Sequence, residues 1–202
     1  MPESVKSTPL AALLAEVRAC TLCTAHLPLC PRPVLRVDAR ASVLIIGQAP
    51  GTRVHASGIP WDDASGERLR SWMAVDGEAF YDPARFAIMP MGFCYPGKGK
   101  GGDLPPRPEC APLWHPRIRP LLPKVQLTLL IGRYAHLGYL PQARQQTLEA
   151  SVRDWRAALK QGLLPLPHPS PRNNRWLRER PWFEAEVVPA LRAALRQAGV
   201  SP

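Results

Sequence analysis

The chain has 202 residues, of which 46% are hydrophobic, and its 26 Lys and Arg residues outnumber 16 Asp and Glu to give a net charge of +10. This length and apolar content predict one packed domain over residues 1–202 and exclude a disordered chain. The sequence holds no apolar run long enough to span a bilayer, and residues 1–6 lack the pattern of a signal peptide. We therefore expect a monomeric cytoplasmic protein, and the basic charge favours a nucleic acid over a membrane as its partner.

Short apolar runs alternate along the chain with stretches of helical periodicity. The runs typical of buried strands are residues 41–46, 85–89, 125–131 and 162–166. The expected helices are residues 10–18, 67–75 with Ser65 as a possible cap, a short one after Gly132, 144–161, and 182–197 after Pro181. This alternation predicts an α/β fold, a three-layer sandwich around a short, mostly parallel four-stranded sheet.

Two loops that follow predicted strands carry the candidate chemistry. Residues 47–51 form a glycine-bounded turn after the first predicted strand. His168 lies between two prolines in the loop after the fourth predicted strand. Proline fixes the backbone, so the second loop is stiff and can aim the imidazole, although an exposed histidine in a simple connection is the alternative. Arg172, Asn173 and Asn174 add donors suited to phosphates or base edges. Ligands of parallel sheets bind beyond the carboxyl ends of the strands, where we expect the two loops to face one another.

Four of the five cysteines have the spacing of a metal centre. Two residues separate Cys20 from Cys23, and fifteen separate Cys94 from Cys110. A short step lets two sulfurs reach one centre, and the second pair can close it from a long loop. The wide second pair favours a [4Fe-4S] cluster over a structural zinc, while free thiols remain a further alternative. No role is predicted for Cys30.

Taken together, these motifs resemble those of the uracil-DNA glycosylase superfamily. Residues 47–51 are similar to its first motif and residues 168–171 to its second. The cysteines at 20, 23, 94 and 110 have the spacing of its iron–sulfur, family-four branch, and residues 58–61 resemble the single-strand-selective, family-three branch. The resemblance extends over residues 10–195.

The resemblance implies a monofunctional DNA glycosylase of base excision repair, which hydrolyses the N-glycosidic bond of uracil or another deaminated base flipped into a pocket. It implies that His168 donates a hydrogen bond to the leaving base and that Gln48 presents polar groups at the pocket. Trp61 would stack on the base, and Ser170 would contact a DNA phosphate. The remaining residues expected to bind substrate are Gly47, Ala49, Pro50, Gly51, Arg172 and Asn173.

The chain departs from the superfamily pattern at three points. Ala49 stands where some branches have a carboxylate or amide that positions the water. Val54 and His55 stand where the iron–sulfur branch has an acidic pair, which makes His55 a candidate for that role. Asp62 and Asp63 are alternative carboxylates, or else cap a helix. Pro90 stands where family members have an asparagine that pairs with uracil.

Two other functions stay open at this level. One is a non-catalytic nucleic-acid-binding protein that retains the glycosylase scaffold and metal cluster. The other is a zinc-stabilised nucleotide-binding domain in which residues 47–51 hold a phosphate, although the longer glycine pattern and the lysine of a phosphate loop are absent.

Overall fold

A computed structural model describes residues 8–200, so the segment of residues 1–6 lies outside the described part. Four strands form the main sheet in the order β2 (Phe86–Ile88), β1 (Val43–Ile46), β5 (Leu127–Ile131) and β6 (Leu163–Leu166). All three neighbouring pairs are parallel. The predicted α/β class is confirmed, and the sheet is parallel throughout rather than mostly so.

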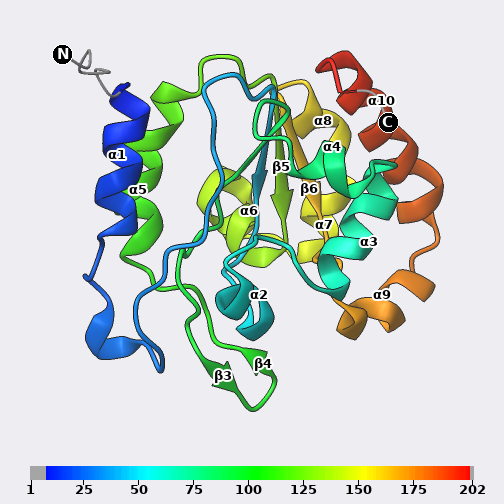
Figure 1. Ribbon diagram of the computed structural model, residues 1–202. Helices are drawn as coiled ribbons and strands as arrows, with labels where there is room; N and C mark the ends of the chain where they lie inside the picture. Colours follow the sequence, from blue (N-terminus) through cyan, green and yellow to red (C-terminus); the bar gives the residue numbers. More distant parts are fainter. Residues whose placement is uncertain (1–7, 201–202) are drawn as a thin grey trace.

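Helices cover both faces of this sheet (Figure 1). Alternate residues of β1 point to opposite sides, so Val43 and Ile45 belong to one apolar core and Leu44 and Ile46 to another. The second core is covered by α1 (Pro9–Arg18), α5 (Cys110–Ile118) and α6 (Arg133–Tyr139). The first is covered by α3 (Ala64–Met73), α4 (Gly77–Tyr81), α7 (Leu148–Arg153) and α10 (Val188–Gln197). The predicted three layers are therefore present.

Three of the predicted helices differ from the structure. The helix expected over residues 182–197 begins with a π-helical turn at Phe183–Val187 and is α-helical from Val188. The helix expected over residues 144–161 is divided into α7 and α8 (Trp155–Leu159), because Asp154 ends the one and begins the other. The helix expected from Glu67 begins earlier, at Ala64. Its cap is Asp63, which accepts a hydrogen bond from the Gly66 amide at 2.8 Å, and not Ser65.

The remaining differences are short elements that no periodicity marks. They are α2 (Thr52–Ser57), α9 (Asn174–Arg178) and a two-stranded hairpin, β3 (Lys98–Gly99) and β4 (Gly102–Asp103), besides α4 and α5. Helical turns of the 3₁₀ type occupy Thr24–His26, Arg119–Leu121, Pro141–Arg144 and Pro171–Asn173, and a π-helical turn at Phe183–Val187 precedes α10. Elements of two to nine residues are too short for hydrophobic spacing to identify.

The sheet directs the functional loops to one end of the molecule. In Figure 1 the strands point downward, and α2 and the β3–β4 hairpin lie beyond the ends of their arrows. Within residues 8–200, no helix has both the length and the apolar character needed to cross a membrane.

Candidate active site

A cavity of about 420 Å³ opens at the carboxyl end of the sheet, within the usual size of a small-molecule site. Loops that follow β1 and β6 face each other across it, as the sequence predicts. The cavity is lined by all but one of the predicted catalytic and substrate-binding residues: Gly47, Gln48, Ala49, Pro50, Gly51, Trp61, His168, Ser170, Arg172 and Asn173. We call residues 47–51 with Pro90 the first wall, and residues 168–173 the second wall.

Hydrogen bonds within the second wall fix the position and the tautomer of His168. The Ser170 amide donates to His168 Nδ1 at 3.2 Å, and the Asn173 side chain donates to the His168 carbonyl at 2.7 Å. Because Nδ1 accepts, the proton of the neutral ring is on Nε2. Burial lowers the pKa of His168, an effect that the negative charge of Asp63 opposes. The second wall therefore presents a neutral imidazole whose Nε2–H donates to no residue between 8 and 200.

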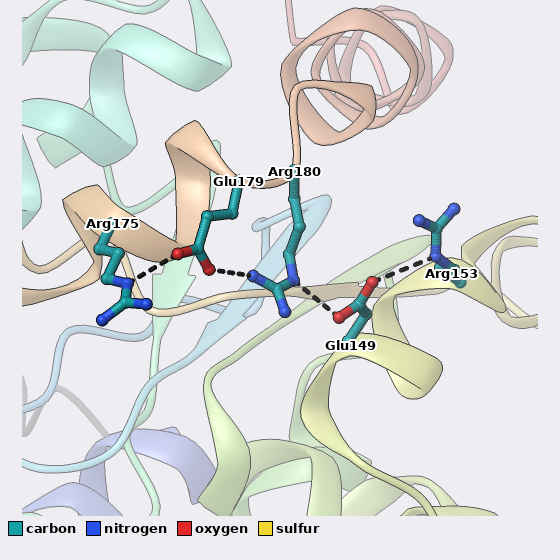
Figure 2. Close-up of polar contacts among 5 residues, drawn as sticks. All are labelled: Glu149, Arg153, Arg175, Glu179 and Arg180. Atoms are coloured by element: carbon teal, nitrogen blue, oxygen red, sulfur yellow. Dashed lines mark hydrogen bonds and ion pairs between the residues drawn. The ribbon is translucent and has the colours of Figure 1, made fainter.

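Side chains behind the second wall hold it in place. Arg68 of α3 donates to the Ser170 carbonyl at 3.2 Å and to Asn174 Oδ1 at 2.7 Å. Figure 2 shows the chain of ion pairs that joins α9 to α7, with Arg180 between Glu179 and Glu149 at 3.2 and 2.7 Å. The wall is thus attached to two helices of the same sheet face.

A buried histidine joins β5 to β6, the strand from which the second wall emerges. His136 Nε2 lies 3.0 Å from the Leu130 carbonyl and 3.1 Å from the Leu166 carbonyl, at the ends of β5 and β6. Only a protonated Nε2 can donate to both carbonyls. Burial lowers the pKa of His136 to about 4, so the ring is neutral at physiological pH.

Trp61 lies between the two walls in a strained backbone conformation. Its φ of 59° is unusual for a residue with a side chain. The ring centroid is 5.6 Å from that of His168, with the planes inclined by 33°. A Cβ on Gly47 would lie 2.8 Å from Trp61 Cζ2, so the glycine makes room for the indole. Such strain concentrates at functional sites.

The first wall is held mainly by its backbone. The amides of Met91 and Gly92 donate to the carbonyls of Gly47 and Gln48, each at 2.9 Å. Gln48 Nε2 donates to the Leu104 carbonyl at 3.2 Å.

Pro90 gives the first wall no polar group that could substitute for an asparagine amide. It has no N–H, and its carbonyl accepts from His115 Nε2 at 3.0 Å. The other ring nitrogen of His115 lies 2.7 Å from the Tyr139 hydroxyl, and burial lowers the pKa of His115 to about 4. A neutral His115 therefore fixes the Pro90 carbonyl.

Among the described residues that line the cavity, Asp63 and Asp103 are the carboxylates. Asp63 caps α3 through Oδ1, which leaves Oδ2 outside that bond. Asp103 comes from the β3–β4 hairpin, and its Oδ2 would be 3.3 Å from a Cβ on Gly51. Sequence reasoning missed Asp103, although its position just after a glycine-rich turn was a usable signal. Asp62 pairs with Arg53 at 3.5 Å and does not line the cavity.

His55 is the predicted catalytic residue that the structure does not bring into the cavity. Its ring centroid lies 6.0 Å from that of Tyr95, and its carbonyl accepts from Arg32 at 2.5 Å. Burial lowers the pKa of His55, and the charge of Arg32 lowers it further. The ring of His55 therefore lies beside Tyr95 and is not part of the cavity lining.

The four cysteines predicted to bind a metal line one small apolar hollow: Cys20, Cys23, Cys94 and Cys110. Burial raises the pKa of Cys94 to about 11 and of Cys110 to about 12. In the described range, no three or more His, Cys, Asp or Glu side chains are arranged to hold a metal ion. The thiols thus surround a space rather than converge on one point. An all-sulfur donor set in apolar surroundings fits an iron–sulfur cluster by its chemistry. Exposed Cys30 does not line the hollow.

Residues 36–192 match the uracil DNA glycosylase superfamily. The matched segment contains both walls of the cavity and the strands that carry them, and it begins after Cys20 and Cys23. The chain therefore belongs to the uracil DNA glycosylase superfamily.

Proposed function

We propose that this protein is a monofunctional DNA glycosylase that acts as a monomer and hydrolyses the N-glycosidic bond of uracil or another deaminated base. The observation that carries the proposal is the neutral imidazole of His168, whose Nδ1 accepts from Ser170 and whose Nε2–H is left for a ligand beside Trp61. A flipped base stacks on Trp61, an interaction worth about 1–3 kcal/mol. Its oxygen then accepts from His168 Nε2.

This hydrogen bond is most valuable in the transition state. As the C1′–N bond breaks, its electron pair leaves on the base, and the base oxygen becomes negative. A donor already aimed at that oxygen stabilises the charge without reorganisation. The lowered pKa of His168 keeps the ring neutral, so the hydrogen bond with Ser170 persists while His168 donates.

We assign the water-positioning role to Asp63. Ala49 offers no polar side chain, and the negative charge of Asp63 already acts on His168 across the cavity. The carboxylate stabilises the cationic sugar and accepts the proton of the water whose oxygen bonds to C1′. His55 has no part in this scheme, because it does not line the cavity.

The test is base release from oligonucleotides that carry uracil, hypoxanthine or xanthine. We expect release of at least one base, and a loss of about 10²–10³ in rate for His168→Ala, as for removal of an oxyanion donor. Undiminished release by His168→Ala would refute the assignment of that residue. Retained DNA binding without release of any base would instead favour a non-catalytic DNA-binding protein, for which Ala49 and Pro90 are the supporting observations.

We also propose that Cys20, Cys23, Cys94 and Cys110 hold a [4Fe-4S] cluster, a group that when bound would cross-link the segments that carry these cysteines. No step of the reaction above passes through it. Iron and acid-labile sulfide should be present in protein purified without oxygen and should fall in Cys94→Ser. Cys30→Ser is the matched control and should retain both. Zinc at one ion per chain without iron would contradict the cluster.

A further inference from the structure

The β3–β4 hairpin stands at the mouth of the cavity on a segment that begins and ends at the thiol hollow. Cys94 and Cys110 flank this segment, and the amide of Phe93 donates to Cys110 Sγ at 3.3 Å. At its far end, Gly101, Gly102 and Asp103 line the cavity. Figure 1 shows the hairpin beyond the carboxyl end of the sheet, beside α2. The tip of the hairpin is therefore part of the cavity wall.

The hairpin is attached to both catalytic motifs. Arg172 Nη1 of the second wall donates to the Gly101 carbonyl at 2.8 Å. Gln48 of the first wall donates to the Leu104 carbonyl, immediately after β4. Gly102 has a φ of 139°, and the Arg172 guanidinium occupies the space that a Cβ there would need. Arg172 is thus engaged with protein, and other cations at the mouth are left to meet the nucleic acid.

Two lysines of the hairpin supply those cations. Lys98 and Lys100 are exposed, and neither forms an ion pair with any residue between 8 and 200. Asp103 is opposite Lys98 in the strand register, but its carboxylate lies against Gly51. Glycines at 97, 99, 101 and 102 flank the two lysines in the sequence, so their neighbours along the chain add no side chains that would hinder an extended polyanion.

We propose that the β3–β4 hairpin grips the DNA backbone next to the flipped nucleotide, with Lys98 and Lys100 each bound to a phosphate. The inference rests on the proposed function, because a base flipped into this cavity leaves the phosphates of its own strand at the mouth. Both lysines then act on affinity through counterion release, and they carry no information about the base.

The experiment measures the salt dependence of DNA binding and needs no catalysis. Binding of a duplex that contains a stable abasic-site analogue is followed by fluorescence anisotropy from about 50 to 200 mM salt. The test variant is Lys98→Ala with Lys100→Ala. The matched control is Lys124→Ala with Lys160→Ala, an equal change of charge. These two exposed lysines precede β5 and β6, at the amino ends of the strands and so at the end of the sheet opposite the cavity.

In the hairpin variant, we expect the slope of log K against log salt to fall by about 1.8, or about 0.9 for each lost phosphate contact. The control pair should leave that slope within about 0.3 of the original protein, and both variants should keep its Tm. Equal slopes in the two variants would overturn the proposal that Lys98 and Lys100 bind phosphates, because the effect would then follow net charge alone. A slope change confined to the hairpin variant supports the grip even if no base is released, an outcome that would refute only the proposed catalysis.

Discussion

The two walls of the cavity are built in different ways. In the second wall, side chains bond to the loop backbone: Ser170 and Asn173 orient His168, and Arg68 holds the Ser170 carbonyl. In the first wall, the loop from Gly47 to Gly51 is held mainly by main-chain bonds to Met91 and Gly92. The second wall fixes the position of the His168 imidazole, whereas the first wall fixes the shape of the cavity.

This difference predicts which kind of substitution affects each wall. In the proposed mechanism, the second wall supplies the donor for the leaving base, and its geometry depends on a few polar side chains. The first wall supplies a glycine-lined surface for Trp61 and a proline that offers no N–H to a base. Chemistry should therefore be sensitive to charge and polarity near the second wall and to volume at the first.

The largest effect that we predict within this comparison is the loss of the Asp63 charge beside the second wall. Asp63→Asn keeps the helix cap, because asparagine caps as well as aspartate. It removes the negative charge and with it the carboxylate that we propose as the general base. We expect the single-turnover rate of base release to fall about 10³-fold, within the usual contribution of general base catalysis. The Tm should be nearly unchanged.

Asp103→Asn is the matched control, since it neutralises the other carboxylate of the cavity without affecting a cap. We expect its rate to stay within about tenfold of the original protein. If Asp103→Asn lost the larger share of the rate, the water-positioning role would pass from Asp63 to Asp103.

The sequence predicted the second wall well because its signals are local. Prolines on both sides of His168 imply a stiff loop, and parallel strands imply that this loop meets residues 47–51. It did not predict where His55 lies, since a short helix, α2, places that side chain beside Tyr95 and not in the cavity lining. It also missed Asp103, whose contact with Gly51 depends on how a long loop folds back.

The fold was similarly predictable where elements are long or wholly apolar. All four buried strands were found, but the helix expected over residues 144–161 was not continuous. Thr147 caps α7 by accepting a hydrogen bond from the Ala150 amide, and Asp154 interrupts the helix between α7 and α8. Periodicity records which residues are apolar, and it does not record where a side chain ends a helix.

A second prediction concerns His136, which joins the strands beneath the second wall. Its pKa of about 4 in the folded protein is below the ordinary value of 6.5, so below pH 6.5 the unfolded chain binds a proton that the folded chain does not. The stability associated with neutral His136 is complete above about pH 6.5 and is lost as the pH falls toward 4. At 1.36 kcal/mol per pKa unit, the loss is about 3 kcal/mol.

Urea unfolding at intervals from pH 7 to pH 4 measures this loss. In His136→Gln, we expect the free energy of unfolding to be lower at pH 7 but less dependent on pH than in the original protein. His115→Gln makes the corresponding change under the first wall, where the pKa of His115 is also about 4. An unchanged pH dependence in His136→Gln would show that this histidine does not titrate with folding.

The smallest effect that we predict comes from added volume at the first wall. In Gly47→Ala, the new methyl group would lie 2.8 Å from Trp61 Cζ2, too close for two carbon atoms, so the indole must shift. Because the proposed mechanism stacks the base on Trp61, we expect kcat/KM to fall about tenfold, which is about 1.4 kcal/mol and within the value of one stacking contact. Gly77→Ala is the control, as a Cβ there meets no atom within 4 Å, and it should leave kcat/KM unchanged. A Gly47→Ala variant that lost as much activity as Asp63→Asn would contradict the division between the walls, because a wall that provides only shape should cost no more than the contact it distorts.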